Sequence, residues 1–172
     1  MKLAHILFKI HYYLIIDAAL TQTETAQLAS DSTIITALRK MGYRATSQRI
    51  AICRVALSTQ GHPSVQRIYK EVRKLHPTVS LATVYKTLQV LQDTHLVQEL
   101  TFAQAATRID PNVRPHLNVL CLKCGTIGDI HDQTLGNLVS AAASKAKFIV
   151  TGQRFDIYGI CEKCARNITT TT

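Results

Sequence analysis

The spacing of apolar residues between positions 33 and 93 predicts a series of helices. Gly42 is expected to end the first helix, and Thr46 or Ser47 to cap the start of the second. Ser64 begins another helix that ends before a proline at position 77. Ser80 caps a further helix, whose buried side is predicted to carry Val84, Leu88 and Leu91.

Two short runs, 96–102 and 107–110, follow these helices and indicate a β-hairpin. The last three of these helices, followed by a two-stranded hairpin, have the layout of a winged helix-turn-helix, in which the third of the three enters the DNA major groove. The whole chain has a net charge of +9, and residues 33–107 hold ten Lys or Arg against three acidic residues. A basic excess concentrated in this segment is typical of a domain that contacts phosphates.

After residues 111–115 the pattern changes to that of a small α/β unit. Strands are predicted at 117–122, 126–130, 148–150 and 154–160, and a helix capped by Asp132 at 133–147. The predicted fold class is therefore α+β. We expect a winged-helix domain at 33–110, a hinge at 111–115 and a C-terminal domain at 116–168.

The two ends of the chain are expected to lie outside these domains. Residues 1–32 are interpreted as an N-terminal extension and linker, and residues 169–172 as a disordered tail. The apolar run in the extension is interrupted by His5, Lys9 and Asp17, so it is a poor candidate for a membrane span or a signal peptide. A cytoplasmic protein is therefore expected.

Four of the five cysteines form two C-x-x-C pairs, Cys121 with Cys124 and Cys161 with Cys164. Two such pairs complete the closed tetrahedron of a structural zinc site. Disulfides are disfavoured, because thiols stay reduced in the cytoplasm. A closed site leaves no open ligand position, so the cysteines do not indicate an enzyme. Cys53, on an apolar helix, is interpreted as a small buried hydrophobe.

Six short phrases resemble the ferric-uptake regulator (Fur) family, and their order and spacing are more specific than any one phrase. The resemblance spans about residues 33–166, and the phrases are GYRATSQR, HPSV, SLATVYKTL, RID, HLNVLCLKCG and IYGIC. It implies a homodimeric, metal-dependent transcriptional repressor. The N-terminal winged helix of such a repressor binds a double-stranded DNA operator, and the C-terminal domain dimerises.

The resemblance also implies which residues contact DNA. Side chains near the start of the third helix reach base edges, the N-terminus of that helix suits a phosphate, and basic residues before it contact the backbone or minor groove. The implied DNA-binding residues are Arg44, Gln48, Arg49, Ser80, Thr83, Tyr85 and Lys86.

A regulatory Fe(2+) or Mn(2+) site is implied in the same way, with His62, Asp110, His116 and Asp129 as ligands. These nitrogen and oxygen donors suit such ions and are not selective for soft metals. Because the ligands come from both predicted domains, metal binding would fix the angle between the domains and favour operator binding.

Asn118 departs from the family pattern, because the peroxide-sensing (PerR) branch usually has a second histidine there. Asparagine offers only a neutral carbonyl oxygen. The site could therefore bind metal more loosely, be completed by water, recruit His131, or have lost its response to metal. Asp129 favours the peroxide-sensing branch, since iron-sensing members usually have glutamate at that position.

The sequence thus predicts a repressor in which bound iron reacts with hydrogen peroxide and ligand histidines, His62 or His116, are oxidised. An iron- or manganese-level regulator on the same scaffold is one alternative. A DNA-binding protein made insensitive to metal by Asn118 is another. A zinc hydrolase or thiol oxidoreductase is disfavoured, because no activated nucleophile or base accompanies the cysteines.

Overall fold

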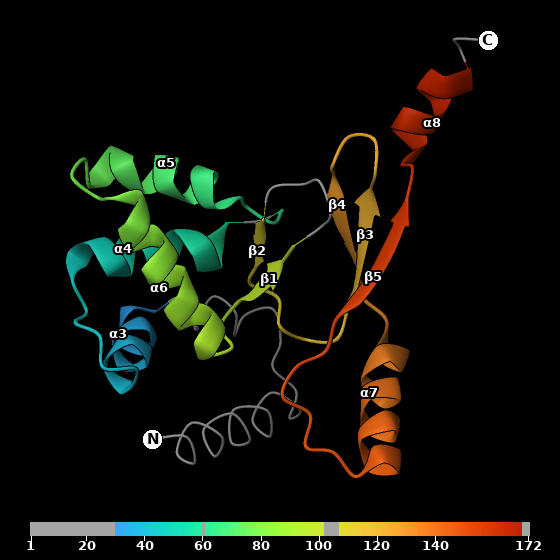
Figure 1. Ribbon diagram of the computed structural model, residues 1–172, viewed down its shortest axis with the longest axis horizontal. Helices are drawn as coiled ribbons and strands as arrows, with labels where there is room; N and C mark the ends of the chain where they lie inside the picture. Colours follow the sequence, from blue (N-terminus) through green and yellow to red (C-terminus); the bar gives the residue numbers. More distant parts are fainter. Residues whose placement is uncertain (1–29, 60, 102–106, 170–172) are drawn as a thin grey trace. The chain divides into compact units, whose positions relative to one another are not determined.

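The structure is a computed structural model that describes residues 30–59, 61–101 and 107–169. The chain divides into an N-terminal unit that ends at Val113 and a C-terminal unit that begins at Arg114. The N-terminal unit holds a two-stranded sheet and the C-terminal unit a three-stranded sheet (Figure 1). Among the described residues, no helix combines the length and apolar character needed to cross a membrane.

Four helices make up most of the described part of the N-terminal unit: α3 (Asp31–Lys40), α4 (Ser47–Ser58), α5 (Val65–Leu75) and α6 (Leu81–Asp93). Each begins after a hydroxyl residue whose side-chain oxygen accepts a hydrogen bond from the backbone N–H three residues later. Such a cap satisfies one of the donors that the first helical turn leaves free. The caps are Ser30, Thr46, Ser64 and Ser80.

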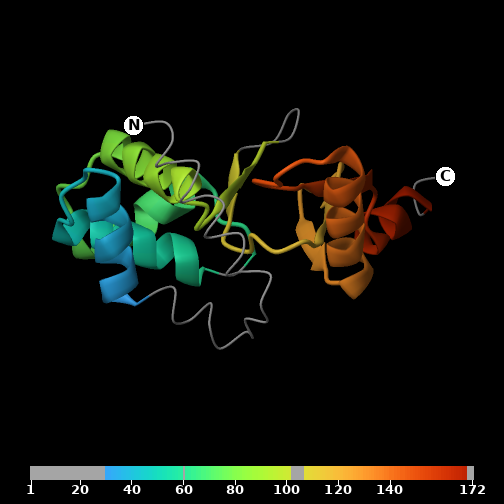
Figure 2. The same cartoon turned by 90° about the horizontal axis from the view of Figure 1, so that it is seen from below.

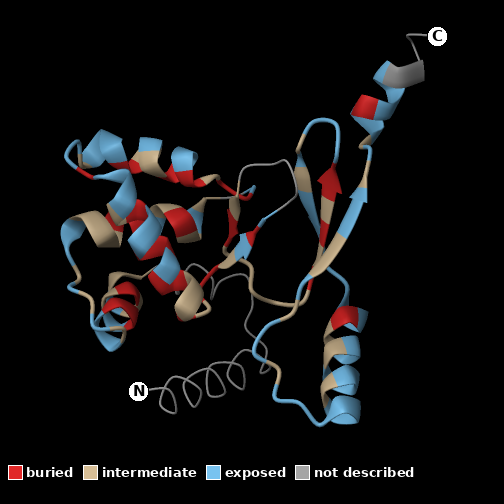
Figure 3. Ribbon diagram, viewed as in Figure 1, coloured by how far each residue is buried: buried red, intermediate tan, exposed pale blue. Residues whose placement is uncertain are grey.

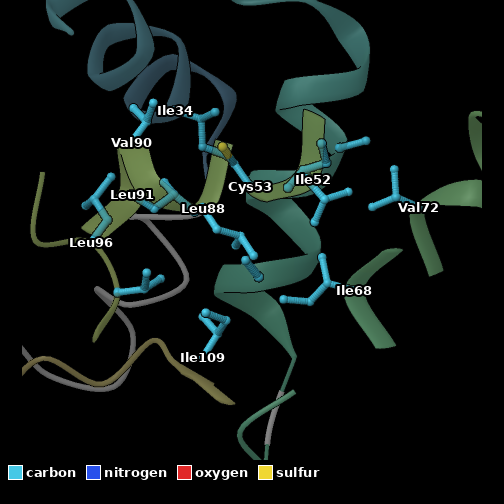
Figure 4. Packing of buried hydrophobic residues seen from close by; sticks show 14 of the residues in the cluster. Ile34, Ile52, Cys53, Ile68, Val72, Leu88, Val90, Leu91, Leu96 and Ile109 are labelled. Atoms are coloured by element: carbon cyan, nitrogen blue, oxygen red, sulfur yellow. The ribbon is translucent and has the colours of Figure 1, made fainter. Parts of the chain in front are cut away.

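The core of this unit lies where the four helices meet (Figures 2 and 4). Ile34 of α3, Ile52 of α4, Ile68 of α5 and Leu91 of α6 are fully buried there. Helices of 10 to 13 residues are marginal in isolation, so this shared packing supplies most of their stability. Cys53 is also fully buried in the core, as the sequence predicted.

The hairpin consists of β1 (Gln98–Leu100) and β2 (Arg108–Asp110), which pair antiparallel. On its other side, β2 is hydrogen-bonded to the segment before α5. The Ile109 N–H donates to the Pro63 carbonyl at 2.9 Å. Both strands are shorter than predicted, and the loop at 102–106 lies outside the described residues. Helices followed by this hairpin confirm the predicted winged-helix layout.

The C-terminal unit is a sheet in the order β4–β3–β5, with α7 (Gln133–Ala146) between β4 and β5 in the chain. The central strand, β3 (Leu117–Cys121), pairs antiparallel with β4 (Ile127–Ile130) and parallel with β5 (Phe155–Gly159). Asp132 caps α7 as predicted, since its carboxylate accepts from the Thr134 N–H at 2.8 Å. The α+β class predicted from the sequence is confirmed.

Two predictions for the C-terminal unit are wrong. Residues 148–150 form no strand, because β5 occupies the free edge of β3 and the chain leaves α7 through Lys147 in the left-handed conformation. A helix, α8 (Glu162–Thr169), was not predicted because its sequence has no apolar periodicity, and it includes the first residue of the expected tail. The other tail residues and nearly all of the predicted extension at 1–32 lie outside the described residues.

Candidate metal sites and nucleic-acid interface

The four cysteines of the two C-x-x-C pairs come together at one end of the C-terminal sheet. Their sulfur atoms all lie within 4.8 Å of one another, and Cys124 Sγ is 3.8 Å from Cys161 Sγ. Four sulfurs arranged tetrahedrally at 2.3 Å from a zinc ion are separated by about 3.8 Å. The cluster therefore has the dimensions of a structural zinc site.

Local backbone structure holds these sulfurs in place. Gly125 has a φ of +70°, a conformation that other residues adopt only with strain, and its N–H donates to the Cys121 carbonyl at 2.8 Å to close the turn. The Leu122 N–H donates to the Gly159 carbonyl at 2.8 Å, which ties this turn to the end of β5. The second pair follows at once, at the start of α8.

Hydrogen bonding and burial shift the pKa values of two of these thiols in opposite directions. Hydrogen bonds from the backbone N–H groups of Cys161 and Cys124 lower the pKa of the Cys121 thiol to about 6. A hydrogen bond with Cys161 and burial raise the pKa of Cys164 to about 12. Cys121 is therefore a thiolate at neutral pH, the form that binds metal. Burial in the helical core raises the pKa of Cys53 to about 12, which makes that thiol unreactive.

In the N-terminal unit, His62 lies beside Asp110. The isolated bridge between Ser64 and Arg108 sets the register, and the same register places His62 opposite Asp110. His62 Nε2 is 3.8 Å from Asp110 Oδ1, and both side chains are at least 96% buried. The Asp110 carboxylate also accepts hydrogen bonds from the Gln98 amide at 2.8 Å and the Asn112 N–H at 2.7 Å.

The backbone at His62 is unusual, because its φ is +52°. Few residues with a Cβ adopt the left-handed region, and those that do are often held there at functional sites. Gly61 immediately before it has a φ of +77°. No sequence pattern indicates this conformation. None identifies Gln98 as a partner of Asp110 either, because cross-strand contacts leave no periodic signal.

In the C-terminal unit, His116 lies beside Asp129. Asn118 of β3 pairs with Asp129 of β4, so side chains at 116, 118 and 129 share one face of the ribbon. His116 Nε2 is 3.9 Å from Asp129 Oδ1. His116 Nδ1 lies 2.8 Å from the Arg114 carbonyl, which can only accept, so Nδ1 carries the proton and Nε2 keeps a lone pair for a metal.

Asn118 is the most unusual polar residue of this unit. Only 1% of it is exposed, and neither its amide nitrogen nor its amide oxygen has a hydrogen-bond partner in the described part of the chain. Burying an unsatisfied amide costs about 1–3 kcal/mol. A residue kept at such a cost on the same face as His116 and Asp129 indicates that something polar binds next to it.

The implied DNA contacts all lie in the N-terminal unit, on α6 and around the start of α4. Tyr85 and Lys86 are exposed on the first two turns of α6, while their neighbour Val84 is fully buried. Ser80 accepts from the Thr83 N–H at 3.1 Å, which leaves exposed backbone N–H groups at the start of α6. This end of α6 therefore presents a phenol, an ammonium group and a helix N-terminus together.

The remaining implied contacts form a second group near the start of α4. The guanidinium of Arg49 donates to the Arg44 carbonyl at 3.0 Å and lies over the Tyr43 ring, 5.0 Å from its centroid. Gln48 donates to the Thr78 hydroxyl at 3.1 Å, and Thr78 lies in the turn before α6. The structure thus connects the start of α4 with the turn that precedes α6.

Comparison with known proteins decides the family. The family model described as "Ferric uptake regulator family" matches residues 40–158, more than half of the chain. The chain belongs to the ferric uptake regulator family. It is 39% identical over 130 residues to the peroxide-responsive repressor PerR of Staphylococcus epidermidis, covering 76% of this chain and 87% of that one.

Solved structures of the ferric uptake regulator family share the fold. The Campylobacter jejuni peroxide stress regulator is 32% identical, with a TM-score of 0.62, over 76% of this chain and 98% of its own. The Helicobacter pylori ferric uptake regulator, with 20% identity and a TM-score of 0.65 over 79% of this chain and 94% of its own, supports the fold alone. The family match ends at residue 158, before Cys161 and Cys164, so their place in the cysteine cluster rests on the geometry given above.

Proposed function

We propose that this member of the ferric uptake regulator family is a metal-dependent, DNA-binding transcriptional repressor that responds to peroxide. The main support for this proposal is that each unit pairs a histidine with an aspartate, His62 with Asp110 and His116 with Asp129. The relatives agree with it, since one is a peroxide-responsive repressor and another a peroxide stress regulator. Such a repressor acts in the cytoplasm, where the operator DNA is.

In this proposal the four residues hold one regulatory Fe(2+) or Mn(2+), while the four cysteines hold a structural Zn(2+). Imidazole and carboxylate donors suit both regulatory ions. Because two ligands come from each unit, a bound ion restricts the movement of one unit against the other. It thereby stabilises the arrangement that binds DNA, and couplings of this kind are typically about 1–3 kcal/mol.

Peroxide sensing would use the ligand histidines. Iron(II), when bound, supplies the reaction with hydrogen peroxide that transfers one oxygen atom to a ligand imidazole and releases the other as water. The protein orients the imidazoles, since the Arg114 carbonyl holds the His116 ring with Nε2 toward Asp129. An oxidised ring at His62 or His116 is a poorer nitrogen donor, so the ligand set fails and the DNA is released.

DNA binding is assigned to the start of α6 together with the loop before α4. Tyr85 and Lys86 reach base edges in the major groove, and the N-terminus of α6 at Ser80 contacts a phosphate. Arg44 and Arg49 contact the backbone or the minor groove. The basic excess of residues 33–107 supplies the attraction to phosphates that all of these contacts share.

A homodimer is part of the proposal, with a second copy of the chain covering the C-terminal unit. The face of the sheet opposite His116 is apolar, yet Ile130 and Ile157 on it are 49% and 46% exposed. Leu138 of α7 and the segment at 148–149 are also exposed (Figure 3). Exposed apolar side chains gathered on one unit are typical of an interface. Dimeric DNA-binding proteins use two recognition helices to bind two half-sites, which fits the winged helix of each copy.

The central test measures how DNA binding depends on the bound metal and on exposure to peroxide. DNA sequences would be selected from a random duplex pool with zinc-loaded, manganese-loaded protein, and their binding measured by fluorescence anisotropy. We expect binding with Mn(II) or Fe(II) but not with zinc in the cysteine site alone. A brief peroxide pulse is expected to abolish binding of the iron form only. Mass spectrometry is expected to find one added oxygen on the peptide that contains His62 or His116.

Other results would support the alternatives. Equal responses to iron and manganese without histidine oxidation would indicate a regulator of iron or manganese level. DNA binding that ignores both metal and peroxide would indicate a metal-insensitive member of the family. Asn118 is the observation that favours this last alternative, because a neutral amide stands where a stronger ligand is usual.

Tyr85→Ala is expected to weaken specific DNA binding about 5–150-fold, the effect of losing about 1–3 kcal/mol at a base edge. The side chain is 49% exposed, so its removal should leave the fold intact. Affinity for unrelated duplex DNA should change little, because that binding depends on phosphates. Gln89→Ala, one turn further along the exposed side of α6, is the matched control. Equal losses for selected and unrelated DNA would contradict a base-reading role for Tyr85.

A further inference from the structure

The β3–β4 ribbon of the C-terminal unit gathers more ligand groups than the regulatory site proposed above uses. Leu117 pairs with Ile130 and Asn118 with Asp129. One further step of the same register places His116 opposite His131. Alternate residues of an antiparallel pair share a face. Two histidines, one carboxylate and one amide therefore lie on the same face at this end of the ribbon.

His116 lies close to each of the other two candidate ligands of this group, His131 and Asp129. The His116 and His131 ring centroids are 5.8 Å apart, with an angle of 41° between the ring planes. Two imidazoles bound to one ion at metal–nitrogen distances of about 2.0–2.1 Å have centroids roughly 4.5–6 Å apart. His116 Nε2 also lies 3.9 Å from Asp129 Oδ1, so a small side-chain rotation brings both atoms to one ion.

The buried amide of Asn118 is an independent observation that points to a ligand. It lies opposite Asp129 in the ladder, and its two polar atoms have no hydrogen-bond partner among the described residues. Asp156, across from Asn118 on the other side, is held by Arg154 through a 2.7 Å ion pair. A cation on the side of Asp129 would give the Asn118 oxygen a partner and offset the cost of its burial.

We propose that His131 is a metal ligand, and that the C-terminal unit binds a divalent cation by itself through His116, Asp129 and His131. The Asn118 oxygen lies next to the ion as a weak neutral donor. Two histidines and one carboxylate form a known site for iron(II) that leaves other coordination positions open. This inference rests on the proposed function, because the open positions are those that His62 and Asp110 would fill. The ion would thus be bound first by the C-terminal unit.

The test is a Mn(II) titration of the full-length, zinc-loaded protein, followed by the electron paramagnetic resonance signal of free Mn(II). His131→Ala is expected to weaken Mn(II) binding at least ten-fold, and His62→Ala to leave measurable binding. His76→Ala, which removes a histidine at the end of α5, is the matched control and should bind as the unaltered protein does. Zinc content should be unchanged in all three variants, because none of them alters a cysteine. Circular dichroism should be unchanged in His131→Ala, since His131 is exposed.

The outcomes separate this inference from the proposed function. If the unaltered protein binds one Mn(II) and His131→Ala binds it within two-fold as tightly, His131 is not a ligand, and the regulatory site of four residues stands without it. If His62→Ala abolishes Mn(II) binding, the C-terminal unit does not hold the ion alone. If the unaltered protein binds no Mn(II) beyond its zinc, the proposed regulatory site fails and the role of His131 fails with it.

Discussion

Replacing Cys121 by serine is expected to release the zinc and unfold the C-terminal unit, while the N-terminal unit stays folded. Zinc binding in small zinc domains contributes about 10–16 kcal/mol at neutral pH, which exceeds the whole stability of most domains. Serine provides neither the thiolate nor the length of the zinc–sulfur bond. The effect should therefore be close to complete.

The C-terminal unit has little else to hold it together. In the described part of this unit, the buried apolar residues are Leu120, Leu135 and two of the cysteines themselves, Cys121 and Cys164. Figure 3 shows that burial is concentrated in β3 and at the start of α7. A unit this small, with so few buried side chains, needs a metal or a partner to be stable.

Zinc analysis by mass spectrometry and limited proteolysis would test this prediction. The variant should carry no stoichiometric zinc, and protease should digest it back to a fragment that ends near Val113, the boundary of the N-terminal unit. Cys53→Ala is the matched control, because Cys53 is buried among the helices of the N-terminal unit. That variant should keep its zinc. A folded Cys121→Ser protein with one tightly bound zinc would show that the cysteines are not the zinc ligands.

The sequence predicted the helices of the N-terminal unit well because their starts carry a local chemical signal. Thr46, Ser64 and Ser80 were expected as caps or helix starts, and each caps its helix. The same was true of Asp132 in the C-terminal unit. A cap depends on residues within one turn, so the information is complete in a short stretch of sequence.

The errors fall where structure depends on distant residues or on other molecules. Residues 148–150 are apolar enough for a strand, but β5 already occupies the edge of β3. Leu138 is one of the apolar residues of α7, yet it is 55% exposed. Apolar residues on a partner-binding surface look like core residues in a sequence, so the pattern cannot distinguish the two.

The candidate sites, like the secondary structure, were predictable from local signals and not where they depend on residues far apart in the chain. The zinc cluster was predictable from spacing alone, because each C-x-x-C pair forms within one turn. The pairing of His62 with Asp110 was implied only by family resemblance, since 47 residues separate them and nothing in the spacing connects them. The left-handed backbone of His62, the partnerless amide of Asn118 and the closeness of the His131 and His116 rings required the structure.

His62→Asn is expected to abolish the gain in DNA affinity that Mn(II) provides, about 5–150-fold for a coupling of 1–3 kcal/mol, and to leave zinc binding unchanged. Asparagine is among the residues that best tolerate a positive φ, so the backbone at +52° should persist. The imidazole would be replaced by a weak neutral donor beside the buried Asp110 carboxylate, so the N-terminal unit would no longer hold the regulatory ion.

Fluorescence anisotropy of a selected DNA duplex, titrated with protein at several Mn(II) concentrations, would measure this loss. His95→Asn is the matched control, because His95 also lies in the N-terminal unit and has a φ of +54°. It should respond to Mn(II) as the unaltered protein does, which would assign the loss to the ligand and not to the backbone. If His62→Asn keeps its full response to Mn(II), His62 does not hold the regulatory ion.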